Sequence, residues 1–128
     1  MRRMMVALIL LASTSGWARD KDGQVWVQGD LSCGQYIEAR AARAKPAYDE
    51  ALVVRISAPS WLAGFLTAYN LVSPDTYNIL GNSDMQSALV WLDNFCRANP
   101  LEDFSTAASA LVAELYPKRH RTRKDAGR

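Results

Sequence analysis

The sequence is poor in the side chains that most often carry enzyme chemistry. It contains one histidine, His120, and two cysteines, Cys33 and Cys96, which do not form a Cys-x-x-Cys pair. Catalytic Ser-His or Cys-His pairs and zinc sites need such residues in groups. No glycine-rich phosphate loop is present either. We therefore expect no enzyme activity, no metal site and no cofactor.

The apolar run near the N-terminus, residues 4–12, is too short to cross a bilayer, which takes roughly 20 residues. It follows the basic head Met1-Arg2-Arg3 and precedes Gly16-Trp17-Ala18, in which the small residues Gly16 and Ala18 suit cleavage. We predict a secretory signal peptide at residues 1–18, cleaved after Ala18, and a periplasmic mature chain without stable membrane insertion. The alternative is an uncleaved anchor.

Two cysteines in an exported chain indicate one disulfide. Cys33 and Cys96 are 63 positions apart, and closing a loop of that length stabilises a fold by roughly 4 kcal/mol in the chain-entropy model. Free or metal-binding thiols are the alternative, and the lack of further ligands argues against it.

Charge is unevenly distributed along the chain. Residues 19–116 carry seven basic and twelve acidic side chains, whereas the tail from Lys118 carries six basic and one acidic. The acidic body argues against nucleic-acid binding, which needs clustered basic groups. The tail, residues 117–128, is predicted to be disordered. It either stays solvated or touches anionic lipid or an acidic partner.

Apolar periodicity predicts an all-α domain over residues 19–116, a small four-helix bundle. A short extended segment at 24–28 precedes it. The expected helices start near Cys33 after a Ser32–Gln35 capping box and end by Pro46, then run from Pro59 to Val72, from Asp84 to Ala98 after a Ser83–Gln86 capping box, and from Pro100 to Tyr116. Residues 45–50 form a linker, and 52–56 are either extended or the edge of a helix.

The second expected helix has two contrasting faces. The inward apolar face comprises Leu62, Phe65, Leu66, Tyr69 and Val72, and the adjacent small-residue face comprises Ala63, Gly64, Thr67 and Ala68. A glycine inside a helix costs about 1 kcal/mol relative to alanine. We therefore expect another backbone to approach closely at Gly64.

The last two expected helices meet at a tight corner beside Cys96. Asn99 and Pro100 end one helix and open the next, with Asn99 as the new N-cap and Glu102 three residues after it. The third helix should turn Met85, Leu89, Leu92, Phe95 and Cys96 inward, and the fourth Leu101, Phe104, Ala108, Leu111, Val112 and Leu115.

Two sets of residues are candidates for partner binding. The first is the loop at 76–82 with its flanking acids, represented by Asp75, Tyr77, Asn78 and Asp84. The second comprises Trp61, Tyr69, Asn70 and Asp93 within the helices, which would line a recognition surface; Trp91 and Asn94 belong to the same helical motifs as structural candidates. The competing interpretation of the second set is structural, because aromatics at helical spacing are usually core and buried polar groups bond to backbone.

The stretches Trp61-Leu-Ala-Gly-Phe-Leu-Thr-Ala-Tyr-Asn70 and Trp91-Leu-Asp-Asn-Phe-Cys96-Arg-Ala-Asn-Pro-Leu101, with Cys33 upstream, resemble small exported bacterial helical proteins. The chain is similar in size and in its single inter-helix disulfide to the HdeA/HdeB acid-stress chaperones. It also resembles the Rap/Tai immunity proteins of type VI secretion, which share an aromatic-glycine helix and a cysteine before a long Ala/Leu helix.

These resemblances imply different functions. An immunity protein would bind and block a toxin, usually a cell-wall amidase, through a protruding loop or an acidic face. A chaperone of the HdeA kind would be a homodimer that opens at low pH and presents apolar surface to unfolding clients. A periplasmic protein of this fold with neither activity is the third alternative. In the first two, the expected partner is another protein, a toxin or an unfolding client.

Overall fold

The computed structural model describes residues 21–22, 24–27, 29, 31–42 and 50–127. Over these ranges the chain forms the helices α1 (Cys33–Ala41), α2 (Glu50–Val72), α3 (Met85–Ala98) and α4 (Phe104–Leu115), followed by the 3-10 helix η1 (Tyr116–Lys118). The all-α prediction is confirmed. Residues 24–27 lie in neither helix nor strand. The predicted signal peptide, its cleavage site and residues 45–49 of the predicted linker lie outside the described residues, and Glu50, the last residue assigned to that linker, begins α2.

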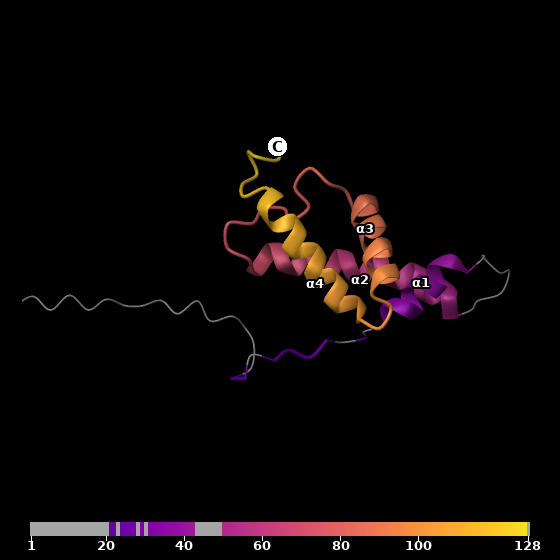
Figure 1. Cartoon of the computed structure of the whole chain (residues 1–128). Coiled ribbons are helices and arrows are strands. Elements are labelled where there is room, and N and C mark those ends of the chain that lie inside the picture. The colour runs from indigo at the N-terminus through magenta and orange to yellow at the C-terminus, as the bar shows by residue number, and fades with distance from the viewer. Residues whose placement is uncertain (1–20, 23, 28, 30, 43–49, 128) are drawn as a thin grey trace, which may run out of the picture.

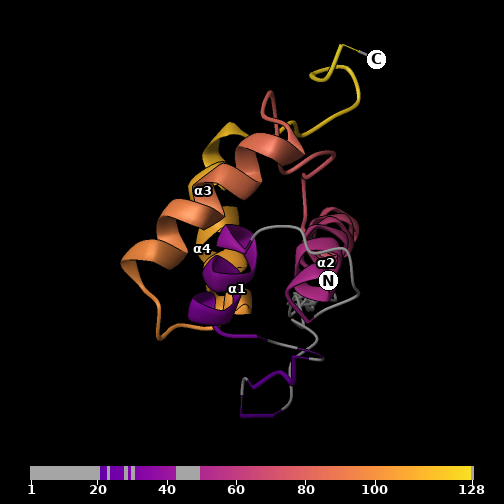
Figure 2. The ribbon, with the colours of Figure 1, turned by 90° about the vertical axis from the view of Figure 1, so that its right-hand side faces the viewer.

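Helix α1 contacts each of the other three α-helices (Figure 1). Seen after a 90° turn, α2 lies to one side of a group formed by α1, α3 and α4 (Figure 2). The core lies between these elements, and its largest fully buried side chains are Tyr36, Phe104, Leu62, Ile79, Leu92, Leu111, Cys33 and Cys96. The disulfide between Cys33 and Cys96 is present, so this prediction is confirmed.

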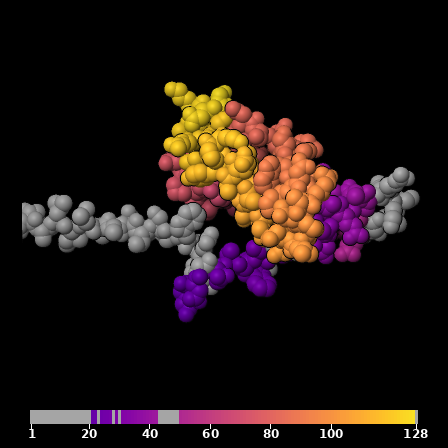
Figure 3. Space-filling view, in the orientation of Figure 1, coloured from indigo at the N-terminus to yellow at the C-terminus, as the bar shows by residue number. Residues whose placement is uncertain are grey.

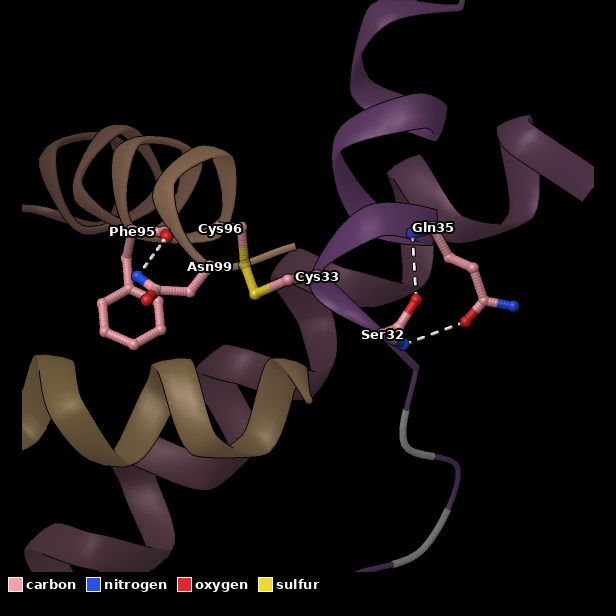
Figure 4. Close-up of a disulfide and its surroundings, with 6 residues drawn as sticks. All are labelled: Ser32, Cys33, Gln35, Phe95, Cys96 and Asn99. Carbon is pink, nitrogen blue, oxygen red and sulfur yellow. Dashed lines mark hydrogen bonds between the residues drawn. A yellow bond between two sulfur atoms is a disulfide. The ribbon is translucent and has the colours of Figure 1, made fainter. Parts of the chain in front are cut away.

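The N-terminus of α1 is fixed by local and by distant bonds. The hydroxyl of Ser32 accepts from the Gln35 N–H at 3.1 Å, and the Gln35 side chain accepts from the Ser32 N–H at 2.9 Å, which confirms the capping box (Figure 4). The next free N–H groups, of Cys33 and Gly34, donate to carbonyls of residues 102 and 100. The first turn of α1 is therefore satisfied by the corner between α3 and α4.

The same bonds explain why α4 begins later than predicted. A helix starting at Pro100 would pair its carbonyl with the N–H of Phe104. Instead, the Pro100 carbonyl accepts from Gly34 and the Phe104 N–H donates to Leu31. Asn99 caps the end of α3, with its side-chain amide donating to the Phe95 carbonyl at 2.9 Å (Figure 4). The predicted N-cap role of Asn99 is therefore wrong.

Leu101 stays outside α4 and is 96 % exposed, so its predicted inward position is wrong. The other predicted inward residues of α4 are buried: Phe104, Ala108, Leu111, Val112 and Leu115. In α3, Leu89, Leu92 and Cys96 are buried, and Met85 and Phe95 pack against the core as partly buried residues. The N-cap of α3 is Asp84, whose carboxylate accepts from the Ser87 N–H at 2.7 Å, in place of the predicted Ser83.

Helix α2 is longer than predicted and begins at Glu50 instead of Pro59. Residues 52–56 are helical, which decides between the two alternatives for that stretch. The guanidinium of Arg55 donates to the carbonyl of Ala42 at 2.8 Å, just beyond the end of α1. This bond satisfies a free carbonyl at that helix end and ties the first half of α2 to α1.

The outer side of α2 is uncovered in the described part of the chain. Leu62 and Leu66 are buried as predicted, but Val72 is 78 % exposed and its predicted inward position is wrong. The small-residue face is exposed as well. A side-chain carbon placed on Gly64 would meet nothing within 4 Å, so the predicted close approach of another backbone is wrong.

Candidate functional site

The loop between α2 and α3 is held in shape by two asparagines. The side-chain oxygen of Asn70, at the end of α2, accepts from the Ile79 N–H at 2.8 Å. The side-chain oxygen of Asn78 accepts from the Leu80 N–H at 3.1 Å. Ile79 is fully buried and inserts this loop into the core. Asn70 therefore anchors the loop, as its structural interpretation predicted.

The C-terminal segment packs onto the same loop, in place of the predicted disorder. The N–H and carbonyl of His120 pair with the carbonyl and N–H of Asn78 at 3.0 and 3.1 Å. The guanidinium of Arg119 donates to the Asp75 carbonyl at 3.0 Å and lies 3.7 Å above the Tyr116 ring. Figure 3 shows the C-terminal residues, in yellow, against the rest of the molecule at the end away from α1.

Gly81 makes this close packing sterically possible. Its φ is +58°, a left-handed conformation, and a side-chain carbon there would overlap the carbonyl oxygen of Lys118. Two independent constraints, the backbone angle and the neighbouring carbonyl, therefore require glycine at this position.

Gly81→Ala is expected to destabilise the fold by about 1–2 kcal/mol from the left-handed conformation alone, and to loosen residues 118–127. Urea unfolding would measure the first effect and the rate of tryptic cleavage after Arg121 the second. Gly64→Ala is the matched control, because open space surrounds that position and helix propensity should stabilise it by about 1 kcal/mol. Equal stability of the two variants would contradict the packing described here.

We call residues 73–84 and 116–127 together the loop–tail surface. Its basic side chains are Lys118, Arg119, Arg121, Arg123 and Lys124, and its acidic ones are Asp75, Asp84 and Asp125. The loop alone had been expected to be acidic, but the folded-back tail makes this end of the molecule basic. The tertiary structure thus changes the charge of the candidate contact region.

Two of the acidic side chains on the loop–tail surface accept hydrogen bonds from nearby backbone N–H groups and so stabilise local structure. The Ser87 N–H holds the pKa of Asp84 below its usual range, because the carboxylate caps α3. The Thr122 N–H likewise lowers the pKa of Asp125, whose carboxylate also accepts from the Arg121 N–H. Asp75 is exposed and adopts a left-handed backbone, with φ of 50°. Tyr77 is 41 % exposed, so its ring is available to a partner.

A polar cleft of about 510 Å³ opens between the loop and the tail. We call it the amide cleft, since three asparagine side chains contribute to its wall; the lining residues are Asn70, Tyr77, Asn78, Gly81, Asn82, Ser83, His120 and Ala126. The Nε2 atom of His120 lies 2.9 Å from the side-chain oxygen of Asn82.

The remaining aromatic candidates belong to the core boundary. Trp61 stacks on Phe65, with ring centroids 5.4 Å apart, and meets Phe104 edge-on at 5.6 Å. Trp91 stacks on Phe95 at 5.4 Å. Tyr69 is also partly buried against the core. None of these three candidate rings lines the amide cleft. The structural interpretation therefore fits them better than a role in partner binding.

Asp93 forms a buried ion pair between α1 and α3. Its two carboxylate oxygens accept from the Nε and Nη2 atoms of Arg40 at 3.1 and 2.9 Å, and Asp93 is only 8 % exposed. Asn94, on the outer side of α3, accepts from Arg97. The Arg40–Asp93 pair lines a second cleft, of about 350 Å³. Asp93 is thus occupied by a structural contact.

Tyr36 lies beside this ion pair, fully buried, and its hydroxyl makes no hydrogen bond within the described residues. Burial and then the Asp93 carboxylate raise the pKa of the Tyr36 hydroxyl well above its usual value. A raised pKa means that the neutral phenol stabilises the fold below about pH 10, the usual tyrosine value, and that this contribution is lost as the pH rises further.

Tyr36→Phe is therefore expected to leave stability unchanged or slightly higher at pH 8, where it removes an unpaired hydroxyl. Above about pH 10, the wild type should lose stability faster than the variant. Urea midpoints of both proteins across this range would show the difference. Parallel curves would mean that the Tyr36 hydroxyl ionises as freely in the fold as in the unfolded chain.

Sequence reasoning missed Arg40, Arg119 and His120 as members of these arrangements, whereas Asn82 lies in the predicted contact loop at 76–82. His120 joins Asn78 from a distance of 42 positions, and no local pattern connects them. Across the described residues, no group of three or more His, Cys, Asp or Glu side chains could hold a metal ion. Comparisons of the chain with protein-family models, curated proteins and solved structures give no match.

Proposed function

We propose that this chain is an exported protein-binding module of the immunity or inhibitor kind, which binds and blocks a partner such as a cell-wall-degrading toxin. The observation that supports the proposal is the loop–tail surface. Its loop backbone is bonded on one side by Asn70 and on the other by His120, while Tyr77 remains exposed. A loop held in one conformation loses little entropy on binding, which favours affinity.

The loop–tail surface also has the composition of a contact site. Exposed tyrosine and arginine side chains are enriched among the residues that dominate binding energy. Ser83 and His120 both line the amide cleft, but the Nε2 atom of His120 faces the side-chain oxygen of Asn82 at 2.9 Å, so we favour recognition over catalysis. Blocking would then result from covering the partner's active site with the loop.

The test is capture of a partner from periplasmic extract and from products of neighbouring genes, followed by an assay of the partner's activity. Tyr77→Ala should weaken binding at least tenfold, because a central aromatic contact typically contributes 2 kcal/mol or more. Asn94→Ala is the control, because Asn94 is exposed on α3, outside the loop–tail surface, and accepts from Arg97. Turnover of a small substrate by the purified chain alone would contradict the proposal.

A second candidate, an acid-activated chaperone, is favoured by the uncovered side of α2. Ile56, Leu71 and Val72 are 62, 82 and 78 % exposed there. By length and composition alone α2 could also cross a membrane, and only 17 % of its most apolar window is buried. Because residues 56–74 carry no charge, α2 lacks the basic face typical of helices that lie on membranes. An unfolding client protein therefore suits the exposed apolar side of α2 better than a membrane surface does.

Low pH separates the two candidates. The pKa values of Asp84, Glu114 and Asp125 are lowered by bonds to Ser87, Lys118 and Thr122. Lowered carboxyl pKa values stabilise the fold above about pH 4, and this contribution disappears as the pH falls through the folded values. All three carboxylates are exposed, so we expect only modest loosening down to about pH 3.

Circular dichroism, apolar-dye binding and light scattering of a client protein would follow this acid range. Retained helicity with little dye binding fits the immunity proposal. Dimer dissociation, strong dye binding and protection of the client would favour the chaperone. Leu71→Glu should abolish such protection if α2 is the client surface.

A further inference from the structure

The amide cleft is distinguished by which of its hydrogen-bonding groups are already occupied: the acceptors of its asparagine side chains are used, and their donors are the groups that can face a ligand. The side-chain oxygens of Asn70 and Asn78 are already taken by the Ile79 and Leu80 N–H groups. Because a backbone N–H can only donate, these two bonds fix which end of each amide is oxygen. The Nδ2 group of each residue is therefore its donor end.

Asn82 adds a third amide in the same arrangement. Its side-chain oxygen faces the Nε2 atom of His120 at 2.9 Å. In the tautomer of His120 that carries its proton on Nε2, this contact is a hydrogen bond to the amide oxygen. The Nδ1 atom of His120 is buried and has no partner in the described part of the chain. His120 thus positions the Asn82 amide, whose Nδ2 group is left as a donor at the cleft.

The basic side chains around the amide cleft also favour a negatively charged ligand. Arg121, Arg123 and Lys124 are exposed in the segment that forms one wall. The Asp125 carboxylate in that segment is engaged by the backbone N–H groups of Arg121 and Thr122 at 3.1 and 2.8 Å. Amide donors within a basic rim suit a ligand that is negatively charged and only accepts hydrogen bonds.

We propose that the amide cleft binds a side-chain carboxylate of an acidic partner protein, with the Nδ2 groups of Asn70, Asn78 and Asn82 as donors. This inference rests on the proposed function, since it assigns the chemistry by which the loop–tail surface recognises its partner. A carboxylate is planar and has two acceptor oxygens, so it can accept from several amides at once. Bonds to a charged acceptor are also stronger than bonds between neutral groups.

The test is an NMR titration of the isotope-labelled protein with N-acetylglutamate amide, and with N-acetylglutamine amide as the neutral analogue of nearly the same shape. The glutamate compound should shift the backbone signals of residues 77–83 and 120 in a saturable way, more weakly at high salt. The glutamine compound should shift them little. Equal shifts by both compounds, or no shifts at these residues, would overturn the proposal.

Two isosteric variants locate the site. Asn82→Asp replaces a donor with a carboxylate oxygen and still offers His120 an acceptor, so glutamate binding should weaken at least tenfold. Asn94→Asp makes the same change of charge on α3, where Asn94 is exposed and bonded to Arg97, and binding should change less than twofold. Equal weakening by both variants would show that only net charge matters and would sink the proposal.

The titration needs no partner protein, so its outcome is separate from that of the proposed function. A saturable glutamate-specific site in a protein that captures no partner would leave the cleft intact and remove the immunity proposal. Capture of a partner with unchanged affinity for the Asn82→Asp variant would leave the immunity proposal intact and remove the cleft. The comparison of glutamate with glutamine stands on the wild-type protein even if a variant fails to fold.

Discussion

Reduction of the Cys33–Cys96 disulfide is expected to lower the free energy of unfolding by about 4 kcal/mol, the chain-entropy value for a loop of this length. The bond joins positions 63 residues apart and lies fully buried between α1 and α3. Helix α1 has nine residues, fewer than the roughly 12–15 at which an isolated helix becomes even marginal in water. We therefore expect α1 to be the first element to melt.

Urea unfolding with and without reductant would measure this loss, and the helical signal would report α1. The double variant Cys33→Ala/Cys96→Ala is the control, because reductant should not change its stability. A reductant effect below about 1 kcal/mol, far under the chain-entropy value, would mean that packing alone holds α1 in place.

Asp93→Asn should destabilise the fold by about 2 kcal/mol, since it removes the charge from a bidentate pair and leaves the Arg40 guanidinium uncompensated. The Asp93 side chain is 11 % exposed and that of Arg40 31 %, so water compensates only in part. Urea unfolding at neutral pH measures the effect. The ion pair also joins α1 to α3, so its removal should again destabilise α1 first.

A double variant sharpens this test. Arg40→Gln/Asp93→Asn removes both charges, and it should be less destabilised than the sum of the two single variants. Glu114→Gln, which breaks the exposed Lys118–Glu114 pair at 2.8 Å, should have little effect and serves as the surface control. Strict additivity of the two core substitutions would contradict a coupled ion pair.

The differences between expectation and structure share a cause. Pro100 and Phe104 were expected to bond to each other within α4, yet both bond to the N-terminal end of α1. Asn99 has the chemistry to cap either neighbouring helix, and the position of α1 decides which. In each case the local sequence is compatible with two arrangements, and backbone groups distant in sequence select one.

The candidate site was likewise predictable from local sequence only in part. The loop at 76–82 was expected as a contact region from its own composition, and Tyr77 is indeed exposed on it. Its basic surroundings were not expected, because they come from a tail that looked disordered by charge and lack of apolar residues. The contacts that order the tail are backbone bonds and a stacked Arg119, which composition does not reveal.

Local sequence patterns were enough to predict the four helices, most of their buried faces and the disulfide. Helical periodicity and capping are local, and two cysteines in one chain leave a single pairing. Contacts between distant segments set where α4 begins, place the Lys118 carbonyl against Gly81 and make the tail one wall of the amide cleft, while Gly64 faces open space. The first three outcomes depend on which backbone groups meet across 37 or more positions, and hydrogen-bond geometry at such contacts is fixed by packing, not by neighbours in sequence.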